Sequence, residues 1–369
     1  MKIVYCTDQV YLHGGIEKVL AQKINYFINK KYEVHLITSE QKGKSFCYEM
    51  NKKLHFHDLS INYTRTKSYF SLDNLKQVPK HFKSIKEKLE EIKPDVIVIC
   101  NYTFDFYFIP LLSKKTKTIR EFHASRFYSS KDIVNASFMK KMMNKVNNFF
   151  EKKYSHVVLL NNDEKQYYKS NNLTVIPNAI LFNKNTSIRS GKREQIVIAA
   201  GRIAPVKQFD HLIDVWEQLY NKHQDWSVHI YGEGNLDLVK ELDDTIKQRG
   251  IKNIEMKGVT NQLEDKMKEA SIYAMTSLTE CFPMVLLEAL SSGLPVISYN
   301  SPHGPKNIIS NKEDGVIVKH NDIESFTKQL SELITNEKKR EEYSKNAYKN
   351  VIKFHEDIIM DKWVTLFKK

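Results

Sequence analysis

The fold is decided by the stretch Glu280-Cys281-Phe282-Pro283-Met284-Val285-Leu286-Leu287-Glu288-Ala289-Leu290-Ser291-Ser292-Gly293. An apolar, β-rich run at 272–275 precedes it, and a second run, Pro295-Val296-Ile297, follows it. Pro suits the first turn of a helix and Gly suits its end, so Pro283 and Gly293 bound a short apolar helix. The stretch therefore predicts a strand, a loop, a helix and a second strand, the repeating unit of a parallel sheet.

The same alternation extends through the rest of the chain. In the first half we expect strands at 3–5, 34–37, 96–99, 118–122, 157–160 and 174–176, and helices at 16–30, 74–92 and 137–153. In the second half we expect strands at 195–200, 227–231, 254–256, 272–275 and 296–299, and a helix at 206–221. Strands that alternate with helices indicate right-handed βαβ units. The predicted fold class is α/β, with doubly wound, Rossmann-like domains.

A polar stretch at 183–194, rich in Asn, Ser, Lys and Arg, interrupts the alternation and is the expected linker. It separates a first domain at 1–182 from a second at 195–350, and a length of 369 residues fits two domains. Ligands of such sheets bind beyond the carboxyl ends of the strands, so we expect the two domains to face each other across a cleft.

Composition excludes several classes of protein. The N-terminus runs straight into a strand without the apolar region of a signal peptide, and no stretch approaches 18 uninterrupted apolar residues, so we expect a cytoplasmic chain that spans no membrane. The net charge of +13 would attract nucleic acid, anionic lipid or a diphosphate, and charge alone does not choose among them. The basic residues are scattered and no motif that reads nucleic acid occurs, so we expect no nucleic-acid partner.

Two loops between a strand and a helix carry candidate binding residues. Gly14 and Gly15 precede the first long helix, where glycine lets the backbone approach a ligand and free N–H groups meet an anion. They do not form the G-x-G-x-x-G fingerprint of dinucleotide binding. Arg202 and Lys207 lie in the second loop, where a guanidinium fork and a point charge can hold phosphate.

The opening stretch supplies the third set. It places Glu280 in a loop and Glu288 about a turn and a half into the helix, where each carboxylate could accept hydrogen bonds from sugar hydroxyls. The segment Phe282-Pro283-Met284-Val285 lies between them, and we expect its backbone amides to hold a phosphate oxygen.

These three elements, in this order and in strand-to-helix loops, resemble glycosyltransferase family 4, whose members have the GT-B fold and retain anomeric configuration. The resemblance covers essentially the whole chain. It implies that Glu288 binds the ribose of a nucleotide, Glu280 the donor sugar, and Arg202 with Lys207 the diphosphate, while Gly15 lies under the sugar phosphate. It also implies that His123, just past the strand at 118–122, lies at the reacting sugar.

The same resemblance implies roles for a second loop and for candidate nucleobase residues. Segment 301–309 looks like a Gly-Pro loop of capsule and lipid-linked oligosaccharide enzymes that use UDP-hexoses or UDP-N-acetylhexosamines. Tyr231, Gly232, Gly234 and Val259 are candidates for the nucleobase region. The sequence departs from the family pattern at Gln208 and Cys281, where Gly is usual, which puts fine loop geometry in doubt.

No Asp-x-Asp pair occurs in the sequence and no cluster of His, Cys and Asp has ligand spacing, so we expect no metal and no cofactor. Cations and helix N-termini must then stabilise the departing diphosphate. The expected catalytic residues are His123, Glu280, Arg202 and Lys207. Neither Glu280 nor Glu288 is obviously placed as a nucleophile, which favours a front-face displacement.

The expected function is a retaining transfer of a hexose or N-acetylhexosamine from a nucleotide-diphosphate sugar, with UDP favoured, to a glycan or polyprenyl-linked acceptor in bacterial surface polysaccharide synthesis. Two alternatives stay open, a sugar-nucleotide epimerase of the same fold and a non-enzymatic basic protein that binds nucleic acid. A new glycosidic bond in the product indicates a transferase, whereas an inverted hydroxyl indicates the epimerase. Salt-dependent retention on nucleic acid would favour the basic protein that binds nucleic acid.

Two helical segments have alternative interpretations. The basic, Met- and Phe-bearing segment from Phe138 to Tyr154 is either core packing or a peripheral contact with an anionic membrane. The final segment, 351–369, carries a large apolar stripe that must be buried. By the family resemblance it packs back on the first domain, and the alternative is a cap on the second domain alone.

Overall fold

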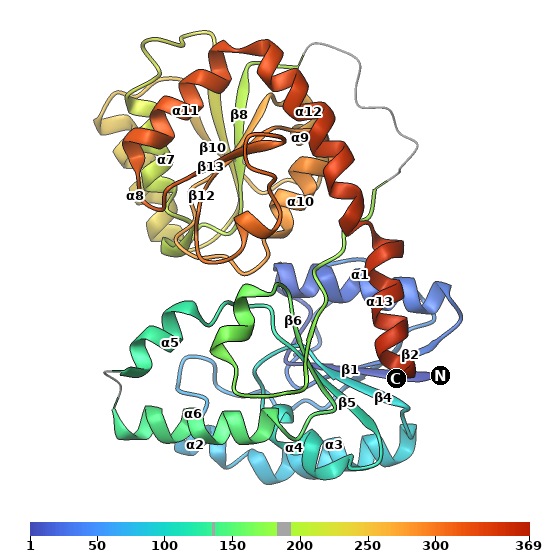
Figure 1. Ribbon diagram of the computed structural model, residues 1–369. Coiled ribbons are helices and arrows are strands. Elements are labelled where there is room, and N and C mark those ends of the chain that lie inside the picture. The colour runs from blue at the N-terminus through green and yellow to red at the C-terminus, as the bar shows by residue number, and fades with distance from the viewer. Residues whose placement is uncertain (135–136, 183–192) are drawn as a thin grey trace. The chain divides into compact units, whose positions relative to one another are not determined.

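A computed structural model describes residues 1–134, 137–182 and 193–369 and divides the chain into two compact units (Figure 1). Unit 1 comprises Met1–Pro177 together with Met360–Lys369, and unit 2 comprises Asn178–Ile359. Ten of the twelve residues expected in the linker, 183–192, lie outside the described residues. Among the described helices, none combines the length and the apolar character needed to cross a bilayer.

Unit 1 is built on a seven-stranded sheet whose order is β3-β2-β1-β4-β5-β6-β7. Every neighbouring pair is parallel. The strand order reverses direction between β1 and β4, which makes the carboxyl ends of these two strands the switch point of the sheet. The strands are β1 (Lys2–Thr7), β2 (Glu33–Thr38), β3 (His55–Asp58), β4 (Val96–Ile99), β5 (Lys117–Glu121), β6 (His156–Leu159) and β7 (Leu173–Val175).

Helices cover both faces of this sheet (Figure 1). The central strand β4, Val-Ile-Val-Ile, is wholly buried, as expected for a parallel strand covered on both sides. Ile85 of α3, Phe106 of α4 and Val4 of β1 belong to one apolar core. The helices of unit 1 are α1 (Gly15–Asn29), α2 (Leu72–Leu75), α3 (Val78–Ile92), α4 (Asp105–Leu112), α5 (Phe127–Val134) and α6 (Phe138–Glu151), with a 3₁₀ turn η1 (Asp163–Tyr167).

Unit 2 repeats the plan with a six-stranded sheet of order β10-β9-β8-β11-β12-β13, again parallel throughout. Its switch point lies between β8 and β11. The strands are β8 (Ile196–Ala200), β9 (Ser227–Tyr231), β10 (Ile254–Gly258), β11 (Ile272–Met275), β12 (Val296–Tyr299) and β13 (Gly315–Val318). The helices and 3₁₀ turns are η2 (Pro205–Lys207), α7 (Phe209–Glu217), α8 (Leu236–Gln248), α9 (Leu263–Glu269), α10 (Met284–Ser291), η3 (Pro305–Asn307), α11 (Ile323–Thr335), α12 (Glu337–Val351) and η4 (Ile352–Phe354).

The structure differs from the expected elements at a few places. The helix expected at 74–92 is two helices, because Pro79 lacks an N–H and fits the first turn of α3. The helix expected at 206–221 begins only at Phe209, because Gln208 adopts φ +47° after η2. The sequence patterns did not predict β3 or β13, two edge strands of four residues each.

The two compact units divide between Pro177 and Asn178. Asn178 Nδ2 donates to the carbonyl oxygen of Phe282, and Ile180 pairs with His355, so these residues are held within unit 2. Arg193, near the end of the expected linker, is likewise tied to unit 2, where it donates to carbonyl oxygens of Met267, Lys268, Ala270, Ser292 and Gly293.

The last helix, α13 (Glu356–Lys368), passes from unit 2 into unit 1 at Met360. Trp363 is fully buried there, and Lys23 Nζ of α1 lies 3.8 Å from the centre of its ring. Phe367 packs 5.3 Å from the ring of Phe27, and Lys117 Nζ donates to the carbonyl oxygens of Leu366 and Phe367 at the helix end. The final ten residues are therefore part of the packing of unit 1.

We expect Trp363→Ala to lower the free energy of unfolding of unit 1 by about 3–5 kcal/mol, because it removes a fully buried aromatic side chain. The measurement is chemical denaturation followed by far-ultraviolet circular dichroism. The neighbouring Lys362 is exposed, so Lys362→Ala is the matched control and should change stability by about 0.5 kcal/mol or less. Equal stability of the two variants would contradict the buried role of α13.

Candidate functional site

In unit 2, the loops that follow β8 and β11 bring two predicted residues into direct contact. Lys207 Nζ lies 2.5 Å from Glu280 Oε1, and both side chains are largely shielded from solvent, with 20% and 13% exposed. The pair lies beyond the carboxyl ends of the two strands that flank the switch point. The contact therefore places a cation and a carboxylate side by side, where both can bind a polar ligand.

Lys207 is fixed by its backbone as well as by its ion pair. Thr276 Oγ1 donates to the carbonyl oxygens of Lys207 and Gln208, and the amide of Leu278 donates to Val206. Gln208 has φ +47° and ψ 49°, in the left-handed region that costs a residue with a Cβ roughly 1 kcal/mol or more. This conformation explains physically why glycine suits the position after the lysine.

Glu280 is held from the other side by the Gly-Pro loop noted in the sequence. The amide of Gly304 donates to the carbonyl oxygen of Glu280 at 2.9 Å, and the amide of Glu280 donates to Pro302 at 3.3 Å. A Cβ on Gly304 would lie 2.8 Å from Glu280 Cβ and 2.9 Å from Pro283 Cδ. Glycine is required here because the two segments approach so closely.

Helix α10 carries the remaining residues of the quoted stretch. Pro283 is its N-cap and offers no N–H, so of the four residues expected to present amides only Phe282, Met284 and Val285 can do so. Glu288 follows on the same helix and is 8% exposed. Burial is the main cause that raises the pKa of the Tyr273 phenol on β11, and the nearby carboxylate of Glu288 raises it further.

The other predicted residues of unit 2 differ in their exposure. Arg202 is exposed, Tyr231 is buried and Val259 is exposed. Gly232 and Gly234 lie against the loop that holds Arg202, since a Cβ on either glycine would come within 1.9 Å of a carbonyl oxygen, that of Gly201 or of Ile203. The two glycines therefore have a packing role that is sufficient to explain them.

In unit 1, Gly14 is the N-cap of α1 and Gly15 is its first residue. A Cβ on Gly15 would meet nothing within 4 Å, whereas one on Gly14 would meet the carboxylate of Glu17. Glu17 is buried, accepts a 2.7 Å hydrogen bond from Gln9 Nε2, and has a raised pKa because of its burial. The backbone at Gly15 is accordingly open to a ligand.

His123 follows β5, and its Nε2 lies 3.5 Å from Glu121 Oε1. The same carboxylate oxygen accepts from Lys23 Nζ, and both members of this ion pair are almost fully buried. Burial alone would raise the pKa of Glu121, but the charges of Lys23 and His123 and their hydrogen bonds bring the pKa to about 2. Glu121 is thus an ionised buried anchor that holds the imidazole ring.

Sequence reasoning missed three polar residues at the switch point of unit 1. Asp8 follows β1 and Asn101 follows β4, and Asn101 Nδ2 donates to Asp8 Oδ1 at 2.5 Å. Arg65 bridges Asp8 and Glu40, with Nη2 at 2.5 Å from one carboxylate and Nε at 2.8 Å from the other. The available signal was a polar residue within two positions of the end of each of two buried strands, Asp8 after β1 and Asn101 after β4.

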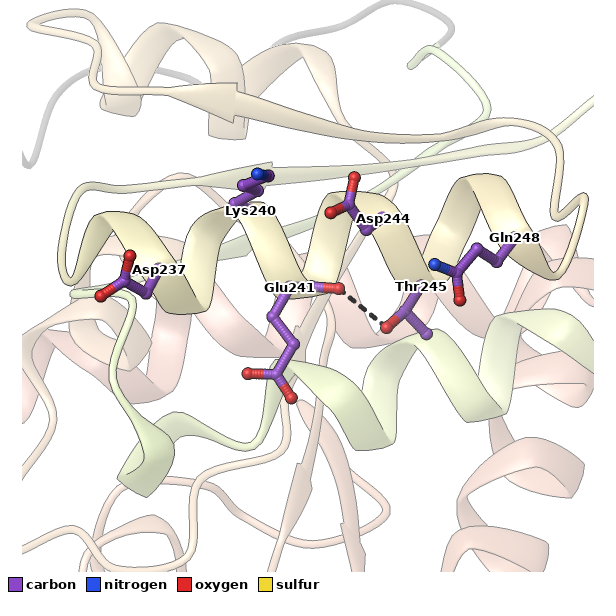
Figure 2. Close-up of a pocket in the computed structure, with 6 residues that line it drawn as sticks. All are labelled: Asp237, Lys240, Glu241, Asp244, Thr245 and Gln248. Atoms are coloured by element: carbon purple, nitrogen blue, oxygen red, sulfur yellow. Dashed lines mark hydrogen bonds between the residues drawn. The ribbon is translucent and has the colours of Figure 1, made fainter.

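A depression elsewhere on unit 2 offers no comparable chemistry. Figure 2 shows its six labelled side chains along α8, with Thr245 Oγ1 donating to the carbonyl oxygen of Glu241. All six come from one helix, so no second element provides an opposing wall. We assign no function to this surface.

Comparison with known proteins follows the same division of the chain. The family description "Glycosyltransferase Family 4" matches residues 13–181, and "Glycosyl transferases group 1" matches residues 183–350. An uncharacterised glycosyltransferase of Haemophilus influenzae is 25% identical over 332 residues, which cover 88% of this chain and 87% of that protein.

A relative from Campylobacter jejuni, named as an α-1,4-N-acetyl-D-galactosaminyltransferase acting on a GalNAc-containing diNAcBac-PP-undecaprenol, is 25% identical over 96% of this chain and 94% of its own. Among solved structures, a TarM variant from Staphylococcus aureus in complex with fondaparinux, α-GlcNAc-glycerol and UDP superposes with a TM-score of 0.81. The sequences are 16% identical and each chain is covered completely, so this likeness shows the shared fold.

We expect Glu121→Gln to lower the free energy of unfolding by about 3–5 kcal/mol at neutral pH, because Lys23 is left as an unpaired buried cation. The depressed pKa makes the contribution of the carboxylate complete above its ordinary value of 4.5 and lost as the pH falls toward about 2. Denaturation between pH 7 and pH 2 measures both effects. The double variant Lys23→Met/Glu121→Gln should regain stability at neutral pH, and an unchanged acid profile in Glu121→Gln would contradict the assignment.

Proposed function

The chain belongs to glycosyltransferase family 4, and from that premise we propose that it transfers a hexose or N-acetylhexosamine from a UDP-sugar, with retention, to a glycan or polyprenyl-linked acceptor of a bacterial surface polymer. Membership decides against the epimerase and the non-enzymatic alternatives. The observation that carries the proposal is the contact between Lys207 and Glu280 beyond the switch point of unit 2.

The Lys207–Glu280 pair suits a donor that carries both a diphosphate and a sugar. Without donor, the two side chains neutralise each other at 2.5 Å. A diphosphate oxygen competes for Lys207 and for exposed Arg202, and the released carboxylate of Glu280 then accepts hydrogen bonds from sugar hydroxyls. Glu288, one turn and more along α10, is assigned to the ribose hydroxyls, which are good donors to a carboxylate.

UDP is the favoured nucleotide because the TarM structure contains it, and a lipid-linked acceptor is favoured because the Campylobacter relative is named for one. The Gly-Pro loop that clamps Glu280 fits the same class of donor. The acceptor is assigned to unit 1, whose switch point carries Asp8, Arg65 and Asn101. Arg65 is already balanced by two carboxylates, which favours a hydroxyl-rich group over an anion.

We assign the transfer step to a front-face displacement. The bond from the anomeric carbon to the diphosphate oxygen breaks as the acceptor oxygen bonds on the same face, and the departing phosphate oxygen takes the acceptor proton. Lys207 and Arg202 stabilise the charge that develops on the diphosphate. His123 is assigned to a sugar hydroxyl, with Glu121 fixing its ring.

We expect Glu288→Ala and Lys207→Ala each to lower kcat/KM by about 100-fold or more, because each removes a contact to the donor. Initial rates of UDP release measure the effect, and circular dichroism checks the fold. Glu241→Ala on the exposed surface of α8 is the control for the loss of a carboxylate and should retain wild-type activity. Near-wild-type activity in a folded Glu288→Ala protein would overturn the donor assignment.

The proposed reaction needs no metal, since cationic side chains are assigned to the diphosphate. Among the described residues, no group of three potential metal ligands lies at Lys207 and Glu280. We expect full activity in excess EDTA, measured as sugar transfer before and after chelation. A loss of tenfold or more that Mg²⁺ or Mn²⁺ restores would refute the metal-free mechanism.

We further propose that unit 1 rests on an anionic membrane surface through α6. Five apolar side chains of this helix are exposed to solvent: Phe138 (84%), Met139 (72%), Met142 (49%), Val146 (37%) and Phe149 (54%). Core packing, the alternative interpretation of this segment, does not account for them. The inner side of the segment does pack on the core, through Phe150 and Tyr154, and Asn147 there accepts from Tyr107 Oη at 2.8 Å.

The charge on α6 fits the same partner. Lys140, Lys141 and Lys145 are exposed beside the apolar stripe. The one acidic residue of the helix, Glu151, is buried and paired with Arg126. An apolar stripe flanked by lysines is the arrangement that binds anionic lipid at a bilayer interface.

We expect the triple variant Phe138→Ser/Met139→Ser/Phe149→Ser to bind vesicles that contain phosphatidylglycerol at least about tenfold more weakly than the wild type. Co-sedimentation with vesicles measures binding. Leu236→Ser removes a side chain of 82% exposure from unit 2 and serves as the control. Equal binding by wild type and triple variant, or binding to purely zwitterionic vesicles of the same strength, would contradict the role of α6.

A further inference from the structure

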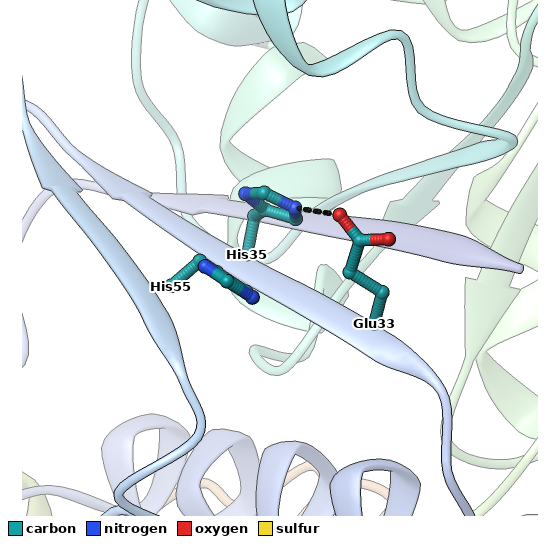
Figure 3. Close-up of side chains that lie close together, drawn as sticks. All are labelled: Glu33, His35 and His55. Atoms are coloured by element: carbon teal, nitrogen blue, oxygen red, sulfur yellow. Dashed lines mark hydrogen bonds and ion pairs between the residues drawn. The ribbon is translucent and has the colours of Figure 1, made fainter.

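Four ionisable side chains gather on one face of β2 and β3, away from every residue assigned above. Glu33 and His35 lie two residues apart on β2, and His55 and His57 lie two residues apart on β3. The parallel register sets His35 beside His55 and Ile37 beside His57, so all four side chains point to the same face of the sheet. Figure 3 shows Glu33, His35 and His55 close together.

The contacts within this cluster form a continuous chain. His35 Nε2 lies 3.1 Å from Glu33 Oε1, and His35 Nδ1 lies 3.1 Å from His57 Nε2. The ring of His55 stacks on that of His35 with centroids 4.6 Å apart. One nitrogen or oxygen atom each from Glu33, His35 and His55 lies within 4.8 Å of the others.

We propose that Glu33, His35 and His55 bind a zinc ion, with His57 orienting His35 from outside the coordination sphere. Two imidazoles and one carboxylate are a ligand set that zinc prefers, and three protein ligands leave a fourth position for water. The ion takes the place of the proton between His35 Nε2 and Glu33 Oε1. His35 Nδ1–H then donates to His57 Nε2, the partner that ligating histidines commonly require.

The side chains can reach coordination distance by rotation. Ligand atoms about a tetrahedral zinc lie roughly 3.3 Å apart, so the widest separation must shorten by roughly 1.5 Å. Glu33 has 42% of its side chain exposed and His55 is exposed, so both can change rotamer, while buried His35 stays fixed. Lys2 Nζ, 3.5 Å from Glu33 Oε1, is also half-exposed and can move aside.

The protonation states support the geometry. Burial lowers the pKa of His35 and of His57, and the hydrogen bond from His35 lowers the pKa of Glu33. A lower pKa favours the deprotonated form of each of these three groups, which is the form that binds metal. The charges of Lys2 and Lys88 disfavour an added cation at this cluster, whereas the charges of Glu33 and Glu91 favour it.

The site lies at the amino end of β2, whereas Gly15, His123 and Asp8 follow the carboxyl ends of strands. Zinc would therefore tie β3, an edge strand, to β2 without taking part in transfer. Zinc binding at this place does not depend on the proposed transfer activity.

The test uses the full-length chain without a polyhistidine tag, stripped with EDTA and dialysed against micromolar ZnCl₂. We expect elemental analysis to find about one zinc per chain and MgCl₂ to give none, since Mg²⁺ prefers oxygen ligands. His55→Ala and Glu33→Gln should reduce zinc to background, and His57→Ala should weaken its affinity by about tenfold. His156→Ala, a partly buried histidine on β6, is the matched control and should keep wild-type uptake.

A second measurement is thermal unfolding, which should shift upward with zinc in the wild type and in His156→Ala, less in His57→Ala, and not in His55→Ala or Glu33→Gln. Background zinc in the wild type, or equal uptake by wild type and folded His55→Ala, overturns the proposal. Transfer activity is assayed on the same samples and should not respond to zinc removal.

Discussion

Both units depend on one constraint, that every strand of both sheets runs in the same direction. Central parallel strands bury both faces, so away from the edges of the sheet a polar group leaves the core where a strand ends. The carboxyl ends of β8 and β11 deliver the loops of Lys207 and Glu280, and those of β1 and β4 deliver Asp8 and Asn101. The direction of the strands therefore determines at which edge of each sheet the polar loop residues gather.

Charge inside the units is handled in two different ways. Glu121 and Lys23 are almost fully buried and permanently satisfied by each other, so they act as a scaffold for His123. Lys207 and Glu280 keep part of their surface exposed, and each has capacity left for another partner. A buried ion pair that cannot separate holds a neighbouring side chain in place, whereas either member of a partly exposed ion pair can exchange its partner for a ligand.

The sequence alone predicted the α/β class and nearly every central strand, because β-branched runs such as Val96–Ile99 have no competing interpretation. It also placed Glu280, Lys207 and Gly304 in the loops that meet. It missed β3, which is half-exposed and contains one strong β-former, and with it the pairing of His55 with His35. Spacing along the chain reveals ligands within one element, whereas contacts between strands depend on register, and no tight turn sets the register of the parallel strands β2 and β3. The sequence likewise gave no sign that Asn178 to Ile180 is held by residues from 282 to 356.

Unit 1 is discontinuous in sequence, since its last ten residues follow the whole of unit 2. During synthesis, residues 178–359 are made before Trp363, so most of the second unit emerges while the first still lacks a buried side chain of its core. Completion of unit 1 must wait for residues 360–369. A nascent chain therefore carries an exposed apolar surface around Lys23 and Phe27 until Trp363 and Phe367 emerge, and a product truncated before these residues retains that surface for chaperones and proteases to recognise.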